Sequence, residues 1–219
     1  MVMAQSLFIT LKNNHPDCQI DVLAPSWSLA LMERMPEVTH AVAMPLAHGQ
    51  FNFFARLKLG KSLGSAAYDQ TILLPNSWKS ALSPFFASIP LRTGNVGECR
   101  WGLLNDARRL DKSVLTMTVQ RFVALGLPGT AALPPVCPTP SLSISVEQQV
   151  KVIEKFDLSA MFYKMSESEA PQALQPILAL CPGAEYGEAK RWPVEHYAAV
   201  AKQKLAETHL VVSSKYGRT

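Results

Sequence analysis

Helical and strand-like patterns alternate through the first half of the chain, and this alternation constrains the fold more than any other feature. Apolar residues recur with helical spacing in residues 3–11, 27–35, 51–63 and 78–86. Short apolar runs separate these segments, at residues 19–24, 38–44, 68–74 and 89–93. Strands that alternate with helices about every 20 residues are typical of βαβ units around a mostly parallel sheet. The sequence therefore predicts an α/β fold that binds ligands at the carboxyl ends of its strands.

The second half of the chain contains a break and then a second α/β pattern. A long loop is predicted at residues 94–110, a helix at 116–125 and a proline-rich loop at 128–140. The later predicted elements are a helix at 146–156, a strand at 177–181, a helix at 193–205 and a strand at 208–212. We place a domain boundary near residue 170, between a Rossmann-like domain at 1–170 and the beginning of a second Rossmann-like domain at 171–219.

Both ends of this pattern look incomplete. A doubly wound domain normally begins with a strand, whereas the pattern here begins with a helix. The roughly 50 residues after the boundary are too few to bury an independent α/β core. We therefore expect that residues 1–170 lack the first strand of their domain, and that the chain is a fragment truncated at both ends.

Composition excludes several classes of function. The 219 residues are 48% hydrophobic and 17% charged, with a net charge of +4. Mild basicity favours acidic partners such as nucleotides or phosphorylated lipids, but the absence of a Lys/Arg block argues against nucleic acid. The four cysteines are widely spaced, which predicts reduced thiols in a cytoplasmic protein and no zinc site. No apolar stretch is long enough to span a membrane, and no secretory signal opens the chain.

The run CPGAEYGEAKRWP, from Cys181 to Pro193, carries the clearest chemical signal. It follows an apolar strand and leads into a helix, and its glycines bring backbone N–H groups near a ligand. A flexible loop, the cation Lys190 and a helix N-terminus together form an anion site, with Lys190 as a point charge on a diphosphate. A turn with a purely structural role remains the alternative, with Trp192 packed beneath it. The run is neither a P-loop nor a dinucleotide fingerprint.

Three long segments, including this run, carry a family resemblance. The second is LPNSWKSALSPFFASIPLRTGNVGECRWGLLND at residues 74–106, and the third is MAQSLFITLKNNHPDCQIDVLAPSW at residues 3–27. Together they resemble the bacterial lipopolysaccharide (LPS) heptosyltransferases, ADP-heptose-dependent enzymes, and most of all the heptosyltransferase II group. The resemblance covers nearly the whole chain and is weakest between residues 126 and 174.

The resemblance implies a GT-B architecture, in which two Rossmann-like domains face a cleft. It implies inverting transfer of heptose from ADP-heptose to the heptose of a lipid-linked LPS inner-core acceptor, without a metal or other cofactor. The donor diphosphate would be bound by Gly183, Ala184, Glu185 and Lys190. The family's general base is an Asp that would precede Met1, so we assign no catalytic residue to this chain and expect the fragment to be inactive.

The resemblance also directs attention to the acceptor side. The acceptor core is anionic, so polar and cationic side chains near the ligand edge of the first sheet are candidate contacts. These are Asn76, Ser77, Lys79, Arg92 and Arg100. Capping of a helix by Ser77 and ordinary surface charge for the others are the alternatives. A basic helix face at Arg56, Lys58 and Lys61 is either solvated or in peripheral contact with the anionic inner membrane.

Three alternatives to an ADP-heptose transferase fragment stay open. The parent enzyme could be a GT-B transferase that uses another nucleotide sugar. The chain could be a non-catalytic module that retains recognition of the LPS core. It could also be the product of a broken gene, without a function of its own. The sequence indicates no oligomeric state.

Overall fold

The computed structural model describes residues 1–46, 51–162, 171, 173, 176–182, 189, 191–205 and, for their backbone, 209–212. The chain divides into two units, Met1–Ser143 and Ile144–Thr219, which are described separately below. This division comes earlier in the chain than the predicted boundary near residue 170, because the helix at Val146–Lys155 groups with the second unit.

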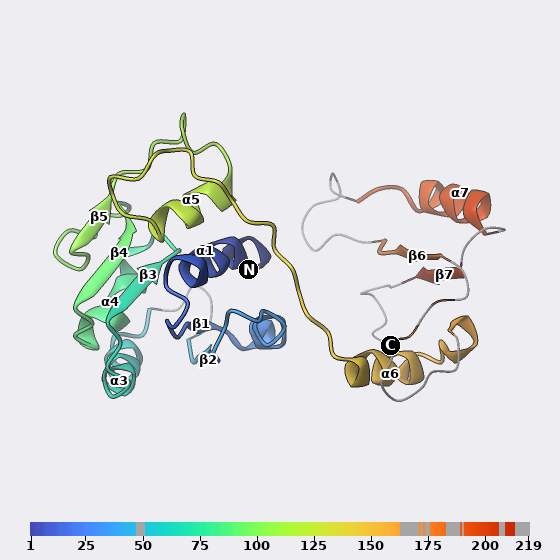
Figure 1. Cartoon of the computed structure of the whole chain (residues 1–219), viewed down its shortest axis with the longest axis horizontal. Coiled ribbons are helices and arrows are strands. Elements are labelled where there is room, and N and C mark those ends of the chain that lie inside the picture. Colours follow the sequence, from blue (N-terminus) through green and yellow to red (C-terminus); the bar gives the residue numbers. More distant parts are fainter. Residues whose placement is uncertain are drawn as a thin grey trace. The chain divides into compact units, whose positions relative to one another are not determined.

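The first unit is a parallel α/β structure (Figure 1). Its strands are β1 (Asp21–Pro25), β2 (His40–Met44), β3 (Gln70–Leu73), β4 (Leu91–Asn95) and β5 (Asp106–Arg108). Its helices are η1 (Val2–Ala4), α1 (Gln5–Asn14), η2 (Ser26–Ser28), α2 (Leu29–Met32), α3 (Phe53–Gly64), α4 (Trp78–Phe86) and α5 (Thr118–Leu125). The strands form two separate parallel groups, β1–β2 and β3–β4–β5. The predicted α/β class is confirmed, and each predicted strand of this region is present.

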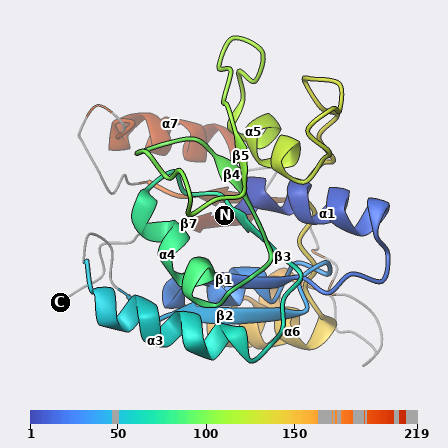
Figure 2. The same ribbon diagram turned by 90° about the vertical axis from the view of Figure 1, so that its left-hand side faces the viewer.

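Helix α1 organises the core of the first unit. Its buried residues Leu7 and Phe8 pack in one cluster with Ala24 of β1 and with Met32 and Met35. Ile72 of β3, Leu74 just after that strand, and Phe122 of α5 pack against the same cluster. Figure 2 shows α1 between α5 and the β1–β2 pair. A single helix therefore holds both strand groups in one apolar core.

Two local predictions differ from the structure. Strand β5 lies within the predicted loop 94–110, where Asp106, Ala107 and Arg108 give no apolar run that would signal a strand. The predicted helix across residues 27–35 is reduced to the four residues of α2, preceded by a 3-10 turn. Trp27, the first apolar residue of that range, is 79% exposed.

The proline-rich segment after α5 is irregular, as predicted, but it is anchored. Ser6 Oγ donates to the Pro138 carbonyl at 2.6 Å, and Gln5 Nε2 donates to the Ser141 carbonyl at 2.6 Å. The Ser143 amide then donates to the Arg34 carbonyl at 2.8 Å. These bonds fix the segment along the first unit as far as Ser143, which explains why the division between units falls there.

The second unit contains α6 (Val146–Lys155), η3 (Ser159–Met161), β6 (Ile177–Leu180), α7 (Val194–Lys204) and β7 (His209–Val212). A capping box begins α6, because Ser145 Oγ accepts from the Gln148 amide and Gln148 Oε1 accepts from the Ser145 amide. Strands β6 and β7 are parallel, with Ile177 opposite His209. The sequence β6–α7–β7 is a βαβ unit, as the sequence predicts for the start of a second Rossmann-like domain.

Candidate functional site

The candidate acceptor site lies at the carboxyl ends of β3 and β4. Two connections meet there, the turn Pro75–Ser77 after β3 and the loop from Val96 to Leu104 after β4. They approach closely at Gly97, where a Cβ atom would lie 2.9 Å from the Asn76 carbonyl oxygen. Only glycine fits at this position without displacing the backbone of the turn. The two connections therefore form one surface at the predicted ligand edge.

Three of the predicted acceptor residues share this surface. Asn76 is exposed, while Ser77 and Lys79 are half-buried at the start of α4. Ser77 is the N-cap residue of α4, but its hydroxyl makes no capping hydrogen bond. The Lys79 ammonium lies 5.8 Å from the centre of the Phe51 ring. Polar groups of these residues are thus present at the carboxyl edge, as the sequence predicts.

Glu98 supplies the cap that Ser77 does not. Its Oε2 accepts from the Trp78 amide at 3.1 Å, which places a carboxylate on the positive end of α4. Glu98 and Cys99 both have left-handed backbone conformations, with φ of 43° and 54°. Each such non-glycine residue costs about 1–2 kcal/mol. No local sequence pattern predicts this cap, because it joins residues 20 positions apart.

Arg100 holds the two connections together from beneath. Its side chain is buried at 1% exposure. The guanidinium donates to the Pro75 carbonyl at 2.7 Å, to Ser80 Oγ at 3.2 Å and to the Asn95 carbonyl. Burial lowers the pKa of Arg100, and the Glu98 carboxylate opposes that change. Arg100 therefore shapes the predicted site from within, and contact of its side chain with an acceptor stays a prediction.

Arg92 is not beside Arg100. It is the second residue of β4, and its guanidinium donates to the Leu103 and Ile89 carbonyls at 2.7 and 2.6 Å. It also lies 5.5 Å from the centre of the Phe85 ring. Arg100, in contrast, binds Asn95 at the opposite end of the same strand. The structure does not bring the two predicted acceptor arginines together.

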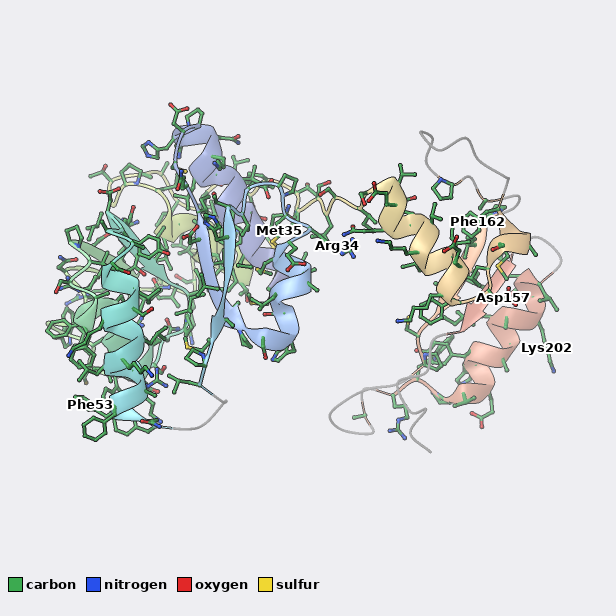
Figure 3. All side chains as sticks on the ribbon, turned by 90° about the horizontal axis from the view of Figure 1, so that it is seen from below. Arg34, Met35, Phe53, Asp157, Phe162 and Lys202 are labelled. Atoms are coloured by element: carbon green, nitrogen blue, oxygen red, sulfur yellow. The ribbon has the colours of Figure 1, made fainter. Side chains whose placement is uncertain are left out.

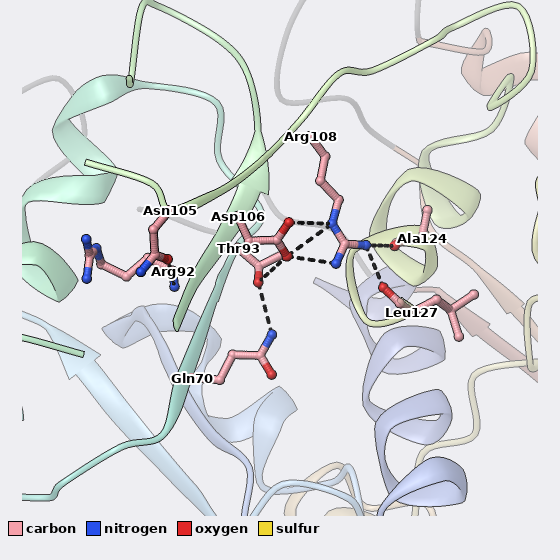
Figure 4. Close-up of polar contacts among 8 residues, drawn as sticks. All are labelled: Gln70, Arg92, Thr93, Asn105, Asp106, Arg108, Ala124 and Leu127. Carbon is pink, nitrogen blue, oxygen red and sulfur yellow. Dashed lines mark hydrogen bonds and ion pairs between the residues drawn. The ribbon is translucent and has the colours of Figure 1, made fainter. Parts of the chain in front are cut away.

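A polar network crosses the middle of the β3–β4–β5 sheet (Figure 4). Gln70 Nε2 donates to Thr93 Oγ1 at 3.0 Å, and Thr93 Oγ1 donates to Asp106 Oδ2 at 2.9 Å. Arg108 pairs with Asp106 at 2.7 Å and donates to the Ala124 and Leu127 carbonyls at the end of α5. The Arg108 hydrogen bonds lower the pKa of Asp106 below its usual value. This network ties three strands to one helix, and sequence reasoning missed it.

We expect Asp106→Asn to lower the free energy of unfolding by about 1–2 kcal/mol near neutral pH, because it removes the carboxylate from this network. The folded pKa of Asp106 is depressed. Its contribution is therefore fully present above the unfolded value of about 3.9 and is lost as the pH falls through the folded value. Urea unfolding at pH 7 and at successively lower pH, to below the folded value, follows this loss. This account would be contradicted if the difference in unfolding free energy between Asp106→Asn and the unaltered chain persisted at the lowest pH. Asp17→Asn, at an exposed position, is the control.

The donor-side residues are only partly described. Gly183, Ala184, Glu185 and Lys190 lie outside the described residues, so their predicted role in diphosphate binding stays a prediction. Pro193 is the N-cap of α7, so the helix begins one residue later than the predicted start at residue 193. Trp192 packs on that helix, with ring centres 5.3 Å from His196 and 4.8 Å from Tyr197. The described part of the motif thus leads from β6 into a helix N-terminus, as predicted.

The predicted basic face of α3 is smaller than the sequence suggests. Arg56 is buried at 8% exposure, and its guanidinium donates to the Lys79 carbonyl at 2.9 Å. Only Lys58 and Lys61 remain exposed. Within the described ranges, no group of His, Cys, Asp or Glu side chains could hold a metal ion. No described helix is both long and apolar enough to cross a membrane.

Relatives of known name share most of this chain. It is 46% identical to lipopolysaccharide heptosyltransferase 2 of Escherichia coli K12, over 97% of the chain and 59% of that protein. The Salmonella typhimurium protein of the same name is 45% identical over the same shares. Lipooligosaccharide heptosyltransferase 2 of Haemophilus influenzae is 43% identical over 96% of the chain and 59% of that protein. The chain thus spans about 59% of the length of these relatives.

Solved structures agree with this relationship. The structure of E. coli ADP-heptose LPS heptosyltransferase II matches with a TM-score of 0.79 at 40% identity, over 97% of this chain and 60% of that one. A glycosyltransferase of family 9 from Veillonella parvula matches with a TM-score of 0.75 at 15% identity, over 96% and 57%, which supports the fold alone. A sequence model of glycosyltransferase family 9 (heptosyltransferase) matches residues 56–214. The chain therefore belongs to glycosyltransferase family 9, the heptosyltransferases.

Proposed function

We propose that this chain is part of an enzyme that transfers heptose from ADP-heptose to a heptose of the LPS inner core. The observation that carries the proposal is 45–46% identity to two proteins named lipopolysaccharide heptosyltransferase 2, over 97% of the chain. The first unit provides the acceptor side, at the carboxyl edge of β3 and β4. The second unit provides the start of the donor side, where β6 leads into α7.

The described contacts sharpen the roles of the acceptor residues. Asn76 and Lys79 offer polar groups at the surface of the edge, and Lys79 supplies positive charge for an anionic core. Arg100 acts beneath them, because its bonds to the Pro75 and Asn95 carbonyls set the positions of both connections. Arg92 is held near the other end of β4 by two carbonyls. We therefore rank Lys79 and Asn76 first among the proposed acceptor contacts.

The proposed chemistry follows from the charges that change during transfer. A carboxylate deprotonates the acceptor hydroxyl, which attacks the anomeric carbon with inversion as ADP leaves. We propose no residue of this chain as that base. Lys190 and backbone amides at Gly183, Ala184 and Glu185 stabilise the negative charge that grows on the diphosphate. In this proposal the reaction proceeds without a metal ion.

A chimeric enzyme tests the proposal. Residues 1–219 replace the aligned segment of the E. coli heptosyltransferase 2, and heptose transfer from ADP-heptose to a heptose-terminated core is measured. We expect transfer, and we expect Lys190→Ala to lower kcat/KM about tenfold by removing one charge from the diphosphate. Lys204→Ala, near the end of α7, is the matched control. If a folded chimera transferred only another sugar, that result would rule out ADP-heptose as the donor.

An aromatic surface formed by the start of α3 and by residues at both ends of α4 suggests where the lipid-linked acceptor meets a membrane. We define this aromatic patch by its exposed members Phe51, Phe53, Phe54, Trp78 and Phe85, which are 37–79% exposed. Phe51 lies 5.1 Å from Trp78, and Phe53 lies 5.5 Å from Phe86, between ring centres. Phe53 lies at the outer end of α3 (Figure 3). Exposed aromatic clusters of this kind mark interaction surfaces.

The charges around the aromatic patch favour an anionic bilayer as its partner. Between residues 41 and 98 the sequence has five cations and two anions, Asp69 and Glu98, a balance of 5 − 2 = +3. Lys58, Lys61 and Lys79 are among these cations, and Lys79 lies beside Phe51. Aromatic rings with nearby lysines suit the interface of a membrane that contains anionic lipids. We therefore propose peripheral contact with the cytoplasmic face of the inner membrane through this patch.

Vesicle sedimentation tests the membrane contact. We expect the chain to bind vesicles that contain phosphatidylglycerol, to bind pure phosphatidylcholine vesicles weakly, and to dissociate near 0.5 M salt, where charges are screened within about 4 Å. Phe54→Ser is expected to reduce binding about fivefold, because Phe54 is 79% exposed within the patch. Val136→Ser is the matched control, because Val136 is 91% exposed in the proline-rich segment. Equal loss of binding in both variants would count against the patch.

A further inference from the structure

Trp27 is the most exposed of the four tryptophans, and it follows directly after a strand. It is 79% exposed, whereas Trp101, Trp192 and Trp78 are 61%, 47% and 37% exposed. A single exposed apolar side chain is common on protein surfaces. The place of Trp27 in the fold therefore decides what its exposure means.

Trp27 lies at the carboxyl edge of the strands, the edge that carries the candidate acceptor site. It is the second residue of η2, which begins directly after β1. The Tyr68 hydroxyl, two residues before β3, donates to Asp21 Oδ2 at the start of β1, at 2.7 Å. Strands β1 and β3 thus begin at one edge, and Ala24 and Leu74, near their opposite ends, belong to the same core cluster. Both strands therefore end at the edge where α/β sheets bind ligands.

The turn that carries Trp27 is fixed on both sides. Pro25 has a φ of −56°, the value that its ring imposes. Ser28 Oγ donates to the Pro25 carbonyl at 2.8 Å, and the Leu29 amide donates to the Ser26 carbonyl. Ser28 itself is buried at 1% exposure. Because this backbone is already ordered, a ligand that binds to Trp27 would have little further ordering to impose.

The indole of Trp27 and the groups near it suit a sugar ring. An indole is flat and apolar, and its face carries partial negative charge. One face of a pyranose ring presents C–H groups with partial positive charge, and hydroxyl groups surround them. The exposed Ser26, directly before Trp27, offers a hydroxyl to such a rim. Anionic groups of a sugar need a cation instead, and Lys79 supplies one at the same edge.

We propose that Trp27 binds the acceptor by stacking its indole on one pyranose ring of the LPS core. The inference rests on the proposed function and adds a contact to it. Asn76 and Lys79 offer polar and positive groups, whereas Trp27 recognises the apolar face of the sugar. Trp27 binds the acceptor in this proposal and takes no part in proton transfer. It therefore contributes to the choice of the sugar that lies at the carboxyl edge.

Binding of a lipid-free sugar tests the contact in the chain of 219 residues. The probe is a deacylated core oligosaccharide that ends in heptose, and calorimetry measures its Kd. Trp27→Ala is expected to weaken binding about tenfold, or about 1.4 kcal/mol. Trp27→Tyr keeps an aromatic face and is expected to bind within about threefold of the unaltered chain. Both variants are expected to keep the Tm within about 2 °C, because the side chain is exposed. A large fall in Tm would assign Trp27 to packing and overturn the proposal.

Phe54→Ser is the matched control, because Phe54 is also 79% exposed but belongs to the aromatic patch. It is expected to weaken binding to vesicles and to leave oligosaccharide binding unchanged, and Trp27→Ala is expected to do the reverse. If Trp27→Ala weakened only vesicle binding, Trp27 would contact lipid and the proposal would be wrong. Equal loss of oligosaccharide binding in both variants would also overturn it, as would failure of the folded, unaltered chain to bind the oligosaccharide.

The chimeric enzyme separates this proposal from the proposed function. In the chimera, Trp27→Ala is expected to raise the KM for the acceptor about tenfold. It is expected to leave kcat and the KM for ADP-heptose within about twofold, as when a binding contact alone is lost. Heptose transfer with an unchanged acceptor KM would overturn the role of Trp27 and leave the proposed function intact. Conversely, Trp27-dependent binding of the oligosaccharide without any heptose transfer would support the contact and reject the proposed function.

Discussion

Arg100→Ala is expected to lower the free energy of unfolding by about 3–5 kcal/mol, the largest loss among the substitutions considered. The substitution removes a buried guanidinium and leaves the Pro75 and Asn95 carbonyls without their donor. It also opens a cavity under the two connections, because the side chain is 1% exposed. Urea denaturation followed by tryptophan fluorescence measures the loss.

Two further variants show whether the shape of the Arg100 side chain matters. Arg100→Lys retains the charge but loses the planar fork that reaches several acceptors, so it is expected to recover less than half of the loss. Arg109→Ala, at an exposed position of the same segment, is expected to change stability by less than about 0.5 kcal/mol. Full recovery by lysine would show that charge, and not the hydrogen-bonded fork, holds the edge together.

The sequence predicted the main elements because their signals are local. Apolar runs and helical spacing identify β1 to β4 and α3 to α7, since each pattern is complete within about ten residues. Strand β5 escaped prediction because its three residues are stabilised by neighbours. Thr93 and Gln70 on adjacent strands and Arg108 on β5 itself hold Asp106 in place. Such partners cannot be identified from the pattern of residues 106–108 alone.

The site was predicted less well than the fold, and for a related reason. Asn76, Ser77 and Lys79 directly follow a strand, so the topology alone places them at the carboxyl edge. For Arg100, sequence reasoning assigned a charge but not a direction, and the side chain turns into the protein toward three acceptors. Glu98, at the helix start, was missed because its bond to Trp78 depends on a left-handed backbone that no residue type there predicts.

The carboxyl edge combines internal rigidity with a polar and aromatic exterior. Arg100 and the cap from Glu98 hold both connections in place, and the strained residues Glu98 and Cys99 lie in the loop after β4. Strain of this kind persists only where surrounding contacts enforce it, and it is concentrated at functional positions. Asn76, Lys79 and the aromatic patch lie outside these bonded connections. A preorganised edge beside the aromatic patch is consistent with the proposed acceptor, which has a sugar to be modified and a lipid anchor.

Gly60→Ala is expected to destabilise the chain by about 2–4 kcal/mol. This is opposite to the usual effect, because alanine inside a helix is normally about 1 kcal/mol more stable than glycine. Gly60 is buried in the middle of α3, where a Cβ atom would lie 2.6 Å from the Cβ of Phe86 and 2.7 Å from the Ser83 carbonyl oxygen. Both atoms belong to α4 and are fixed by its backbone, so the helices must separate. Separation would also shift the aromatic patch, because Phe53 of α3 packs on Phe86.

Thermal and urea unfolding measure the loss, with Gly129→Ala as the control, since no atom lies within 4 Å of a Cβ built there. A stabilising effect of Gly60→Ala would show that α3 and α4 do not pack at this distance.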